Sequence, residues 1–394
     1  MTEYAYVVVG AGMACDAAIA GIRRRDRTGS ILVVGEEPFP PYQRPPLSKQ
    51  LWVDMRLETV FLGSWTRYSD VKLALGTRVS RIDRANRQIE TDDGRRFGYG
   101  KLLLATGARP RTLAGDTAGA YYVGSLAEHI RLMKALAETR TVLVVGGGFI
   151  GAEMAAVLSM AGHRVTWTMI EPHPFAGFFP DDLAGHVTDA YRAHGVIIVP
   201  SGEVTGVESF ASGIRAVMKS GPSLEADLAV VGVGVRPMDE LAQAADLEVD
   251  GGIVVNDYLR TSDEHIWAAG DVAVMAPEKQ PMWHEDHAVT QGRLAGENLA
   301  GASKPYTHRP FYYSDLYQFG YEAIGNCRTS HHDIVEDWVT PGEEGVVYYL
   351  DGGHVVGVLN WNVWNGVQKA ETLMDSGRRY TAAELVGQIR NAVE

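Results

Sequence analysis

The chain has 394 residues, of which 46% are hydrophobic, and this length and composition are typical of a globular protein with two or three domains. Its formal net charge of −13 argues against nucleic acid or an anionic membrane surface as a partner. The same charge excludes no class of small substrate.

The two cysteines, Cys15 and Cys327, are far apart and form no CxxC pattern. The sequence therefore predicts neither a disulfide framework nor a thiolate-ligated metal site, and it favours a reducing compartment. The N-terminus enters a predicted strand near Tyr4 without the basic and apolar segments of a signal peptide, so we expect a cytoplasmic protein.

The first glycine motif lies in residues 4–15, which read YAYVVVGAGMAC. A β-like run leads into Gly10 and Gly12, and a helix is predicted from there to Ile22. Cys15 stands where a third Gly or Ala is usual, and its small thiol is interpreted as a packed core residue. The next predicted strand, ILVVGE, ends at Glu36.

Residues 38–49 read PFPPYQRPPLSK and contain five prolines together with Arg44 and Lys49. A proline-rich loop is stiff, which suits the fixed aim of two cations at a ligand. The same composition also fits a surface loop leading into a helix that Ser48 caps. The residues alone leave both interpretations open.

Residues 64–100 alternate between polar and apolar positions, and Asp93-Gly94 predicts a hairpin turn. The run KLLLATG at 101–107 predicts a buried strand that returns to the sheet carrying Gly10. Arg109-Pro110 then indicates a crossover into a second unit.

The second glycine motif is VLVVGGGFIGAE at residues 142–153, with Gly146, Gly148 and Gly151 at GxGxxG spacing before a predicted helix. A strand, a tight turn and a helix N-terminus are what a dinucleotide pyrophosphate requires. Glu171, after a second β-like run, would accept hydrogen bonds from a ribose 2′-OH and repel a 2′-phosphate, so the motif predicts NADH rather than NADPH. A membrane helix with Gly147 and Gly151 on one face is the weaker alternative, because Glu153 lies within it.

Both motifs place a carboxylate at nearly the same distance after the glycines, so we expect two dinucleotide sites in one chain. Two redox dinucleotides in one protein indicate electron transfer, and one of the two should be a flavin.

The second half adds strand candidates GVIIVP, GIRAVMK and DLAVVGVGVRP, and then IWAAGD, which ends at Asp271. Asp271 would accept hydrogen bonds from a polyol chain or cap a turn. His284, Asp286 and His287 resemble a ligand set, but their spacing fits no common zinc pattern.

From about Pro310 the chain is rich in aromatic residues. IVEDWV, GVVYYL and HVVGVLNW predict a three-stranded antiparallel sheet, and helices are expected near 364–376 and 381–392.

Six segments in this order resemble the FAD- and NADH-dependent oxidoreductases of the glutathione-reductase fold, in the branch of ferredoxin reductases and apoptosis-inducing factor. They are PPYQRPPLSK, KLLLATGARPR, GGGFIGAE, IWAAGD, HEDHAVTQGRLAGENLAG and YSDLYQFGYEAIG. The resemblance implies an α/β chain with two Rossmann-like domains and an α+β C-terminal domain. The FAD-binding domain would be residues 1–113 and 246–309, the NAD-binding domain 114–245 and the C-terminal interface domain 310–394.

The resemblance also assigns residues. Gly10, Gly12, Met13 and Ala14 would hold the FAD pyrophosphate, Glu36 the adenosine ribose, Arg44 and Lys49 the flavin side, Val79 the adenine region and Asp271 the ribityl or pyrophosphate. Gly147, Gly148, Phe149, Ile150, Glu171 and Gly234 would hold NADH. Lys49 and Glu153 would form the ion pair beside flavin N5, with His284, Glu285 and Tyr313 near the isoalloxazine ring. The catalytic set would be Lys49, Glu153 and His284.

Two departures from the family pattern matter. Tyr313 stands where apoptosis-inducing factor has a tryptophan, which puts the strength of a charge-transfer complex in doubt. No cysteine lies in residues 38–49, so a thiol relay has no thiol there.

The sequence alone is compatible with three functions. The first is hydride transfer from NADH to FAD followed by electron delivery to a ferredoxin or another acceptor, by a monomer or homodimer. The second is a slow NADH sensor with a long-lived charge-transfer complex and redox-dependent dimerisation. The third is a flavoprotein scaffold, which the set Lys49, Glu153 and Glu171 disfavours.

Overall fold

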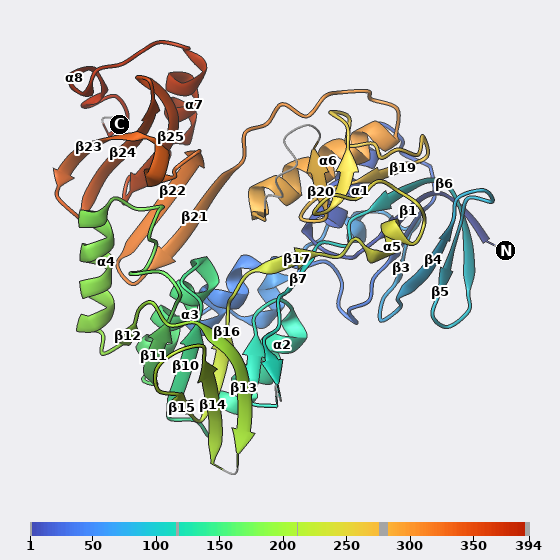
Figure 1. The fold of residues 1–394 in the computed structure, drawn as a ribbon. Coiled ribbons are helices and arrows are strands. Elements are labelled where there is room, and N and C mark those ends of the chain that lie inside the picture. The colour runs from blue at the N-terminus through green and yellow to red at the C-terminus, as the bar shows by residue number, and fades with distance from the viewer. Residues whose placement is uncertain (1, 116–117, 211, 276–282, 391–394) are drawn as a thin grey trace. The chain divides into compact units, whose positions relative to one another are not determined.

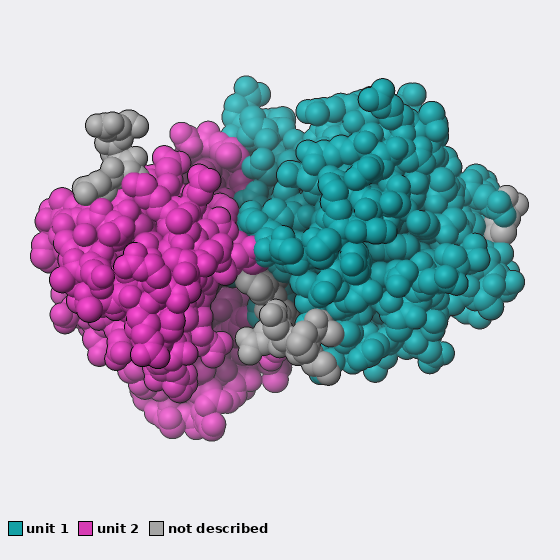
Figure 2. All heavy atoms as spheres, turned by 90° about the horizontal axis from the view of Figure 1, so that it is seen from above, with its two compact units in different colours: residues 1–45, 56–109, 235–308 teal, residues 46–55, 110–234, 309–394 magenta. Residues whose placement is uncertain are grey.

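The computed structural model describes residues 2–115, 118–210, 212–275 and 283–390. The chain divides into two compact units (Figure 2). Unit 1 consists of Met1–Pro45, Arg56–Arg109 and Val235–His308, and unit 2 of Pro46–Met55, Pro110–Gly234 and Arg309–Glu394. The finer division into FAD, NAD and C-terminal domains stays a prediction.

Unit 1 is built on a seven-stranded sheet in the order β3-β2-β1-β6-β5-β4, with β19 also paired to β6 (Figure 1). The strands β1, β2, β3, β6 and β19 run parallel, and their apolar runs are buried, as expected when both faces of a parallel sheet are covered. The bounds are β1 Thr2–Val9, β2 Ile31–Val34, β3 Val71–Ala74, β4 Val79–Asp83, β5 Gln88–Thr91, β6 Arg96–Leu104 and β19 Ile266–Ala268.

The predicted hairpin is confirmed: β5 and β6 pair antiparallel across a turn in which Gly94 has a φ of +81°. The predicted strand at 101–107 begins earlier and ends at Leu104, and it does lie beside β1.

Two helices of unit 1, α1 (Met13–Arg23) and α6 (Glu285–Leu299), cross at very short range because both carry glycine at the contact. A Cβ atom at Gly292 or Gly296 would lie 2.2 Å from the backbone oxygen of Ala14 or Ala18, respectively. The smaller elements of unit 1 are α5 Glu240–Gln243, β17 Val235–Pro237, which pairs with β7 Ala108–Pro110, and β18 Ile253–Val255, which pairs with β20 Ala273–Met275.

Unit 2 contains a five-stranded parallel sheet in the order β12-β11-β10-β16-β9. Its bounds are β9 Ala120–Tyr122, β10 Thr141–Val145, β11 Arg164–Thr168, β12 Ile197–Val199 and β16 Leu228–Val231. The run predicted as one strand, DLAVVGVGVRP, is two strands, because the chain turns at Gly234 with a φ of +100° between β16 and β17.

Helices and a second sheet complete this part of unit 2. The helices are α2 Leu126–Leu136, α3 Phe149–Met160 and α4 Asp181–Ala193, and the sheet joins β8 Ala114–Gly115, β13 Val204–Phe210, β14 Gly213–Met218 and β15 Leu224–Ala226. Short 3-10 helices occur at Pro45–Ser48, Gln50–Trp52, Leu57–Val60, Trp65–Arg67 and Thr329–His331.

The C-terminal part of unit 2 is a five-stranded antiparallel sheet, so the prediction of three strands was wrong. The order is β21 Phe311–Leu316, β22 Phe319–Gly325, β25 His354–Trp361, β24 Glu344–Asp351 and β23 Asp333–Thr340. The two predicted helices are present but shorter, as α7 Val367–Asp375 and α8 Ala382–Leu385.

Aromatic packing joins this sheet to the parallel-sheet part of unit 2. Phe149 contacts Phe178 and Tyr312, and Phe179 contacts Trp361 with ring centroids 5.4 Å apart. Tyr349 also donates a hydrogen bond of 2.7 Å to the carbonyl oxygen of Phe178. Such offset and edge-to-face pairs add to the burial of large apolar rings, so the two parts of unit 2 form one body.

Among the helices that the structure describes, none is long and apolar enough to cross a membrane. Residues 142–162, the weaker membrane-span alternative, form β10, a glycine turn and α3.

Candidate functional site

The first glycine turn joins β1 to α1 in unit 1. Gly10 has a φ of +104°, and a Cβ atom there would lie 2.1 Å from the carbonyl oxygen of Ala105, so only glycine fits. Gly12 is the N-cap residue of α1, and a Cβ atom there would meet no described atom within 4 Å. The turn therefore reaches the start of the helix through two residues that have no side chain.

The second turn, between β10 and α3 in unit 2, repeats this geometry. Gly146 has a φ of +117° and would place a Cβ atom 2.3 Å from the carbonyl oxygen of Gly232. Gly148 is the N-cap residue of α3 and also faces open space, whereas a Cβ at Gly151 would collide with the oxygen of Gly146. At the position of Gly151, α1 has Cys15, which is fully buried, as the sequence predicted.

Neither glycine N-cap can offer a side-chain oxygen to the first N–H groups of its helix. In contrast, α2 begins with Ser125, whose hydroxyl accepts a hydrogen bond of 3.2 Å from the backbone N–H of Glu128. Helix N-termini with open backbone N–H groups and a positive dipole end are suited to phosphate oxygens. The residues present thus fit a dinucleotide pyrophosphate at each turn.

A carboxylate follows β2 in unit 1 and β11 in unit 2. Glu171 lies close to the second turn, since a Cβ atom at Gly147 would be 2.5 Å from Glu171 Oε2, and that oxygen is buried with no hydrogen-bond partner among the described residues. A buried carboxylate oxygen without a donor is costly, so it fits a ligand hydroxyl. In unit 1, Glu36 is exposed just after β2.

Arg44 is held in unit 1 by the residue after Glu36. Its guanidinium lies 2.8 Å from Glu37 and over the ring of Tyr42, and the hydroxyl of Tyr42 also donates to Glu37 at 2.7 Å. Burial alone would lower the pKa of Arg44, but Tyr42, Glu37 and Asp271 more than offset that effect and raise it. The guanidinium therefore stays charged and fixed in direction.

Asp271 follows β19 in unit 1. Burial raises the pKa of Asp271 to about 6, and the positive charge of Arg44 opposes that rise. A carboxylate placed at the carboxyl end of a parallel sheet suits the hydroxyls of a polyol chain.

Sequence reasoning missed Gln291, which lies in α6 and contacts Gly270, the residue before Asp271. Its side chain is fully buried, its Oε1 accepts a hydrogen bond of 2.9 Å from the N–H of Gly270, and its Nε2 has no partner among the described residues. A buried amide nitrogen that lacks a hydrogen-bond acceptor, next to Asp271, is suited to donate to a polar ligand. The signal in the sequence was a polar side chain next to the small residues Ala288, Gly292 and Ala295 of the same helix.

Val79 and Ala14 of unit 1 are packed in its core, whereas Met13 is not. Val79 begins β4 and is 7% exposed, and Ala14 packs against Gly292 where α1 crosses α6. Met13 is the first residue of α1 and is partly exposed. Their predicted contacts with FAD stay predictions.

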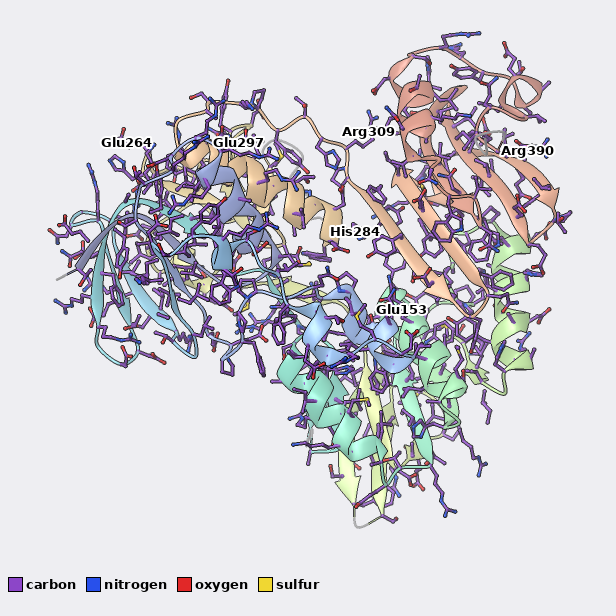
Figure 3. All side chains as sticks on the ribbon, turned by 180° about the vertical axis from the view of Figure 1, so that it is seen from behind. Glu153, Glu264, His284, Glu297, Arg309 and Arg390 are labelled. Atoms are coloured by element: carbon purple, nitrogen blue, oxygen red, sulfur yellow. The ribbon has the colours of Figure 1, made fainter. Side chains whose placement is uncertain are left out.

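His284, labelled in Figure 3, is the N-cap residue of α6. Glu285 is the first residue of that helix. Of the supposed ligand set, Asp286 pairs with His308 at 2.5 Å, while His287 is buried and contacts the hydroxyl of Tyr306 at 3.2 Å. Burial, followed by the charges of His284 and His308, lowers the pKa of His287 to about 4. In the described ranges, no group of three or more His, Cys, Asp or Glu residues is arranged to hold a metal ion.

In unit 2 the structure brings together Lys49, Glu153 and Tyr313. Lys49 Nζ lies 3.3 Å from Glu153 Oε1, 3.3 Å from the carbonyl oxygen of Tyr313 and 4.3 Å from the centre of its ring. The side chains of Lys49 and Glu153 are only 7% and 5% exposed. Burial raises the pKa of Glu153, and Lys49, Ser314 and Ser48 oppose that rise.

Ser48 and Ser314 were not predicted as partners of this pair. Ser48 lies in a 3-10 helix and donates to Glu153 at 2.5 Å, so the alternative that it caps a helix was wrong. Ser314 of β21 donates to the other carboxylate oxygen at 2.6 Å. Both contacts cross more than 100 residues of sequence, so no local pattern indicated them.

Phe149 and Ile150 are the first two residues of α3, and both are partly exposed at the second turn. Gly234 lies between β16 and β17, and its carbonyl oxygen accepts a hydrogen bond of 2.9 Å from the N–H of Arg111. The predicted FAD residues thus lie in unit 1, except Lys49 and Tyr313, and the predicted NADH residues lie in unit 2.

Two family models match the chain. The pyridine nucleotide-disulphide oxidoreductase model matches residues 4–292, and the C-terminal model of mitochondrion-associated apoptosis-inducing factor matches residues 295–336.

Similar proteins include two bacterial reductases. Rhodocoxin reductase of Rhodococcus erythropolis is 34% identical, over 90% of this chain and 86% of its own length. The ferredoxin–NAD(+) reductase component of the anthranilate 1,2-dioxygenase system of Burkholderia cepacia is 33% identical, over 96% and 95%. A Drosophila melanogaster protein named apoptosis-inducing factor 1, mitochondrial, is 28% identical over 95% of this chain, which spans 64% of that protein's length.

Solved structures of similar fold include two reductases. Putidaredoxin reductase, in its covalent complex with putidaredoxin, has a TM-score of 0.86 with 29% identity, over 95% of this chain and 94% of its own. A ferredoxin reductase of Rhodopseudomonas palustris has a TM-score of 0.88 with 27% identity, over 96% of each chain.

Proposed function

Because this chain belongs to the pyridine nucleotide-disulphide oxidoreductase family, we propose that it is an FAD-dependent enzyme that takes electrons from NADH and delivers them to a small carrier protein of the ferredoxin or rubredoxin type. As a member of this family the protein is an oxidoreductase that uses a flavin and a pyridine nucleotide. FAD as the flavin and the carrier as the acceptor are the proposed steps beyond that.

The observation that carries the proposal is the pair of equivalent glycine turns in one chain. Gly10 and Gly12 in unit 1 and Gly146 and Gly148 in unit 2 have the same backbone geometry, and each pair begins a helix without a capping side chain. Two dinucleotide sites support two redox cofactors, one permanently held and one exchanged.

Unit 1 supports the FAD assignment. Its candidate contacts are the open start of α1 for the pyrophosphate, the exposed carboxylate of Glu36 for a ribose, and Arg44 with Asp271 for the polar chain. A bound flavin would accept two electrons at once and release them singly, which is the chemistry that connects a nicotinamide to a one-electron carrier.

Unit 2 supports the NADH assignment. The N–H groups at the start of α3 would bind the pyrophosphate, and the free Oε2 of Glu171 would accept a hydrogen bond from a ribose 2′-OH. The same charge would repel a 2′-phosphate. The buried cation of Lys49, balanced by Glu153, would stabilise negative charge that develops nearby, as the family resemblance implies.

The cysteines support a carrier rather than a disulfide as the acceptor. Cys15 is fully buried, Cys327 is 2% exposed, and burial raises the pKa of Cys327 to about 12. A thiol relay needs an accessible thiolate, and these are the only two cysteines in the chain.

The test is anaerobic mixing of the purified, FAD-loaded protein with NADH, followed by addition of a ferredoxin, a rubredoxin or oxygen. The proposal predicts fast bleaching of the flavin by NADH and steady turnover only with an iron carrier. A long-lived coloured complex that dimerises and turns over slowly with every acceptor would instead indicate the sensor. A protein that stays colourless after reconstitution with FAD would contradict both.

Lys49→Ala tests the role of the cation in unit 2. Removing one partner of a buried ion pair leaves an uncompensated charge that costs about 3–5 kcal/mol, so flavin reduction by NADH should slow or the flavin potential should shift. Lys219→Ala is the matched control, because Lys219 forms an exposed pair with Glu203 in the same unit. Bleaching as fast as in the unmodified protein would exclude this role for Lys49.

A further inference from the structure

The carboxylate of Glu153 is the centre of a closed network that joins three segments of unit 2. Ser48 and Lys49 reach it from residues 46–55, and Ser314 reaches it from β21. The network closes because Lys49 also contacts the carbonyl oxygen of Tyr313, which precedes Ser314. Glu153 itself lies in α3 (Figure 3).

The hydroxyl contacts in this network are shorter than the contact with the cation. Hydroxyl donors lie 2.5–2.7 Å from a charged oxygen and farther from a neutral one. Ser48 lies 2.5 Å from Oε2 and Ser314 lies 2.6 Å from Oε1, whereas Lys49 is 3.3 Å from Oε1. The two serines therefore make closer contacts with Glu153 than the cation does.

We propose that Ser48 and Ser314 are positioning residues that hold Glu153 ionised and fixed in direction, so that Lys49 keeps its counter-charge in a buried site. Each serine donates to a different carboxylate oxygen, so the carboxylate cannot rotate without losing a bond, and uptake of a proton would weaken the bond that the protonated oxygen accepts. The purpose of the charged Lys49 rests on the proposed function, but the effect of the serines on Glu153 does not.

The electrostatics of the site require such donors. Burial opposes the charge of Glu153 and raises its pKa, while Lys49, Ser314 and Ser48 act in the opposite direction. Burial raises the pKa of Tyr191 and of Tyr321 well above the usual value, and the negative charge of Glu153 adds to the rise in both.

Loss of the hydroxyls has a defined consequence for Lys49. Burial already raises the pKa of Glu153, so without the two donors the pKa would rise further and Glu153 would take up a proton at a higher pH. Among the described residues, Lys49 would then keep the carbonyl oxygen and the ring of Tyr313 as partners. An ammonium held by a carbonyl and a ring alone is free to change position.

The experiment is an infrared titration of the full-length protein labelled with 13C-glutamate, in which the Glu153 signal is identified by its loss in Glu153→Gln. We expect the band of the protonated carboxyl to appear at a pH higher by about one unit or more for each hydroxyl removed in Ser48→Ala and Ser314→Ala. Ser314→Thr, which keeps the hydroxyl, should restore the unmodified titration.

Ser159→Ala is the matched control. Ser159 also lies on α3 and contacts the hydroxyl of Tyr317 at 2.8 Å, but it does not touch Glu153. If the alanine variants fail to fold, Ser48→Cys and Ser314→Cys keep the shape with a weak donor and should shift the titration in the same direction. A Glu153 titration that is the same in the serine variants, the control and the unmodified protein would overturn the proposal.

A second readout separates this proposal from the proposed function. The rate of flavin reduction by NADH should fall in Ser48→Ala and Ser314→Ala below the pH at which Glu153 takes up its proton, and should recover above it. If the protein does not oxidise NADH at all, the infrared titration still decides the role of the serines.

Discussion

The carboxylate of Glu171 lies against the backbone of Gly147, so that a Cβ atom at Gly147 would be only 2.5 Å from Glu171 Oε2. This oxygen has no hydrogen-bond partner among the described residues. The glycine turn and the carboxylate therefore form one surface, although 24 positions of sequence, from 147 to 171, separate them.

Gly147→Ala should displace the Glu171 carboxylate. Gly147 does not have a positive φ, so the new methyl group acts through the contact and not through backbone strain. We expect KM for NADH to rise about 10-fold, the effect of losing roughly 1.4 kcal/mol of binding. Gly185→Ala on α4 is the control, because a Cβ there meets no described atom within 4 Å. Equal KM values in both variants would contradict the contact.

Glu171→Gln should change the choice of coenzyme. Loss of a charged hydrogen bond to the ribose costs about 1.5–3 kcal/mol, so kcat/KM for NADH should fall about 10- to 100-fold. The value of kcat/KM for NADPH should rise, because the amide no longer repels a 2′-phosphate. The ratio of kcat/KM for the two coenzymes measures the effect, and Glu203→Gln serves as an exposed control. An unchanged ratio would remove Glu171 from the site.

Asp271→Asn should stabilise the cofactor-free protein at neutral pH. Burial raises the pKa of Asp271 to about 6, so between about pH 4 and pH 6 the folded state binds more protons than the unfolded state. The free energy of unfolding of the unmodified protein therefore falls as the pH rises through this window, and the carboxylate costs about 1–3 kcal/mol above it. Urea unfolding at pH 4.5 and pH 7.5 measures the difference between the two proteins.

The same variant should bind FAD more weakly, because the amide accepts hydrogen bonds less strongly than the carboxylate. A variant that is no more stable than the unmodified protein at pH 7.5, when both are free of FAD, would refute the cost assigned to Asp271.

Gly292→Ala should separate α1 from α6. The added methyl group would lie 2.2 Å from the carbonyl oxygen of Ala14, and overpacking of this kind costs about 1–3 kcal/mol. Because Gly12 and Ala14 begin α1, we expect FAD retention to fall together with the free energy of unfolding. Retention of FAD during gel filtration and urea unfolding test this, and Gly185→Ala is again the control. Full retention with normal stability would show that the helices can move apart without cost.

The C-terminal sheet shows why part of the fold escaped sequence reasoning. Alternation of polar and apolar residues indicates a strand only when one face is exposed. Phe311–Leu316 has consecutive aromatic residues because both faces are covered: Tyr312 packs against Phe149 and Phe178, while the ring of Tyr313 lies beside Lys49. Its sequence pattern therefore did not distinguish this strand from a loop.

Val142–Val145 and the glycines after it show the opposite case. The buried run predicted β10, and Gly146 and Gly148 predicted the turn and the start of α3. These features depend on residues within a few positions of one another, since the positive φ of Gly146 and the bare N-cap at Gly148 are local requirements.

The sequence by itself determined the two glycine turns that precede α1 and α3 and the candidate carboxylates Glu36 and Glu171, because glycine and strand patterns act over short stretches of chain. Only the tertiary structure decided the environment of Glu153. Its partners Ser48 and Ser314 lie 105 and 161 residues away, and a hydroxyl has no periodicity that indicates which distant carboxylate it will meet. The packing of β21 and residues 46–55 onto α3 brings the two hydroxyls to Glu153. Such donors are required there because a buried carboxylate is stable only when it accepts hydrogen bonds.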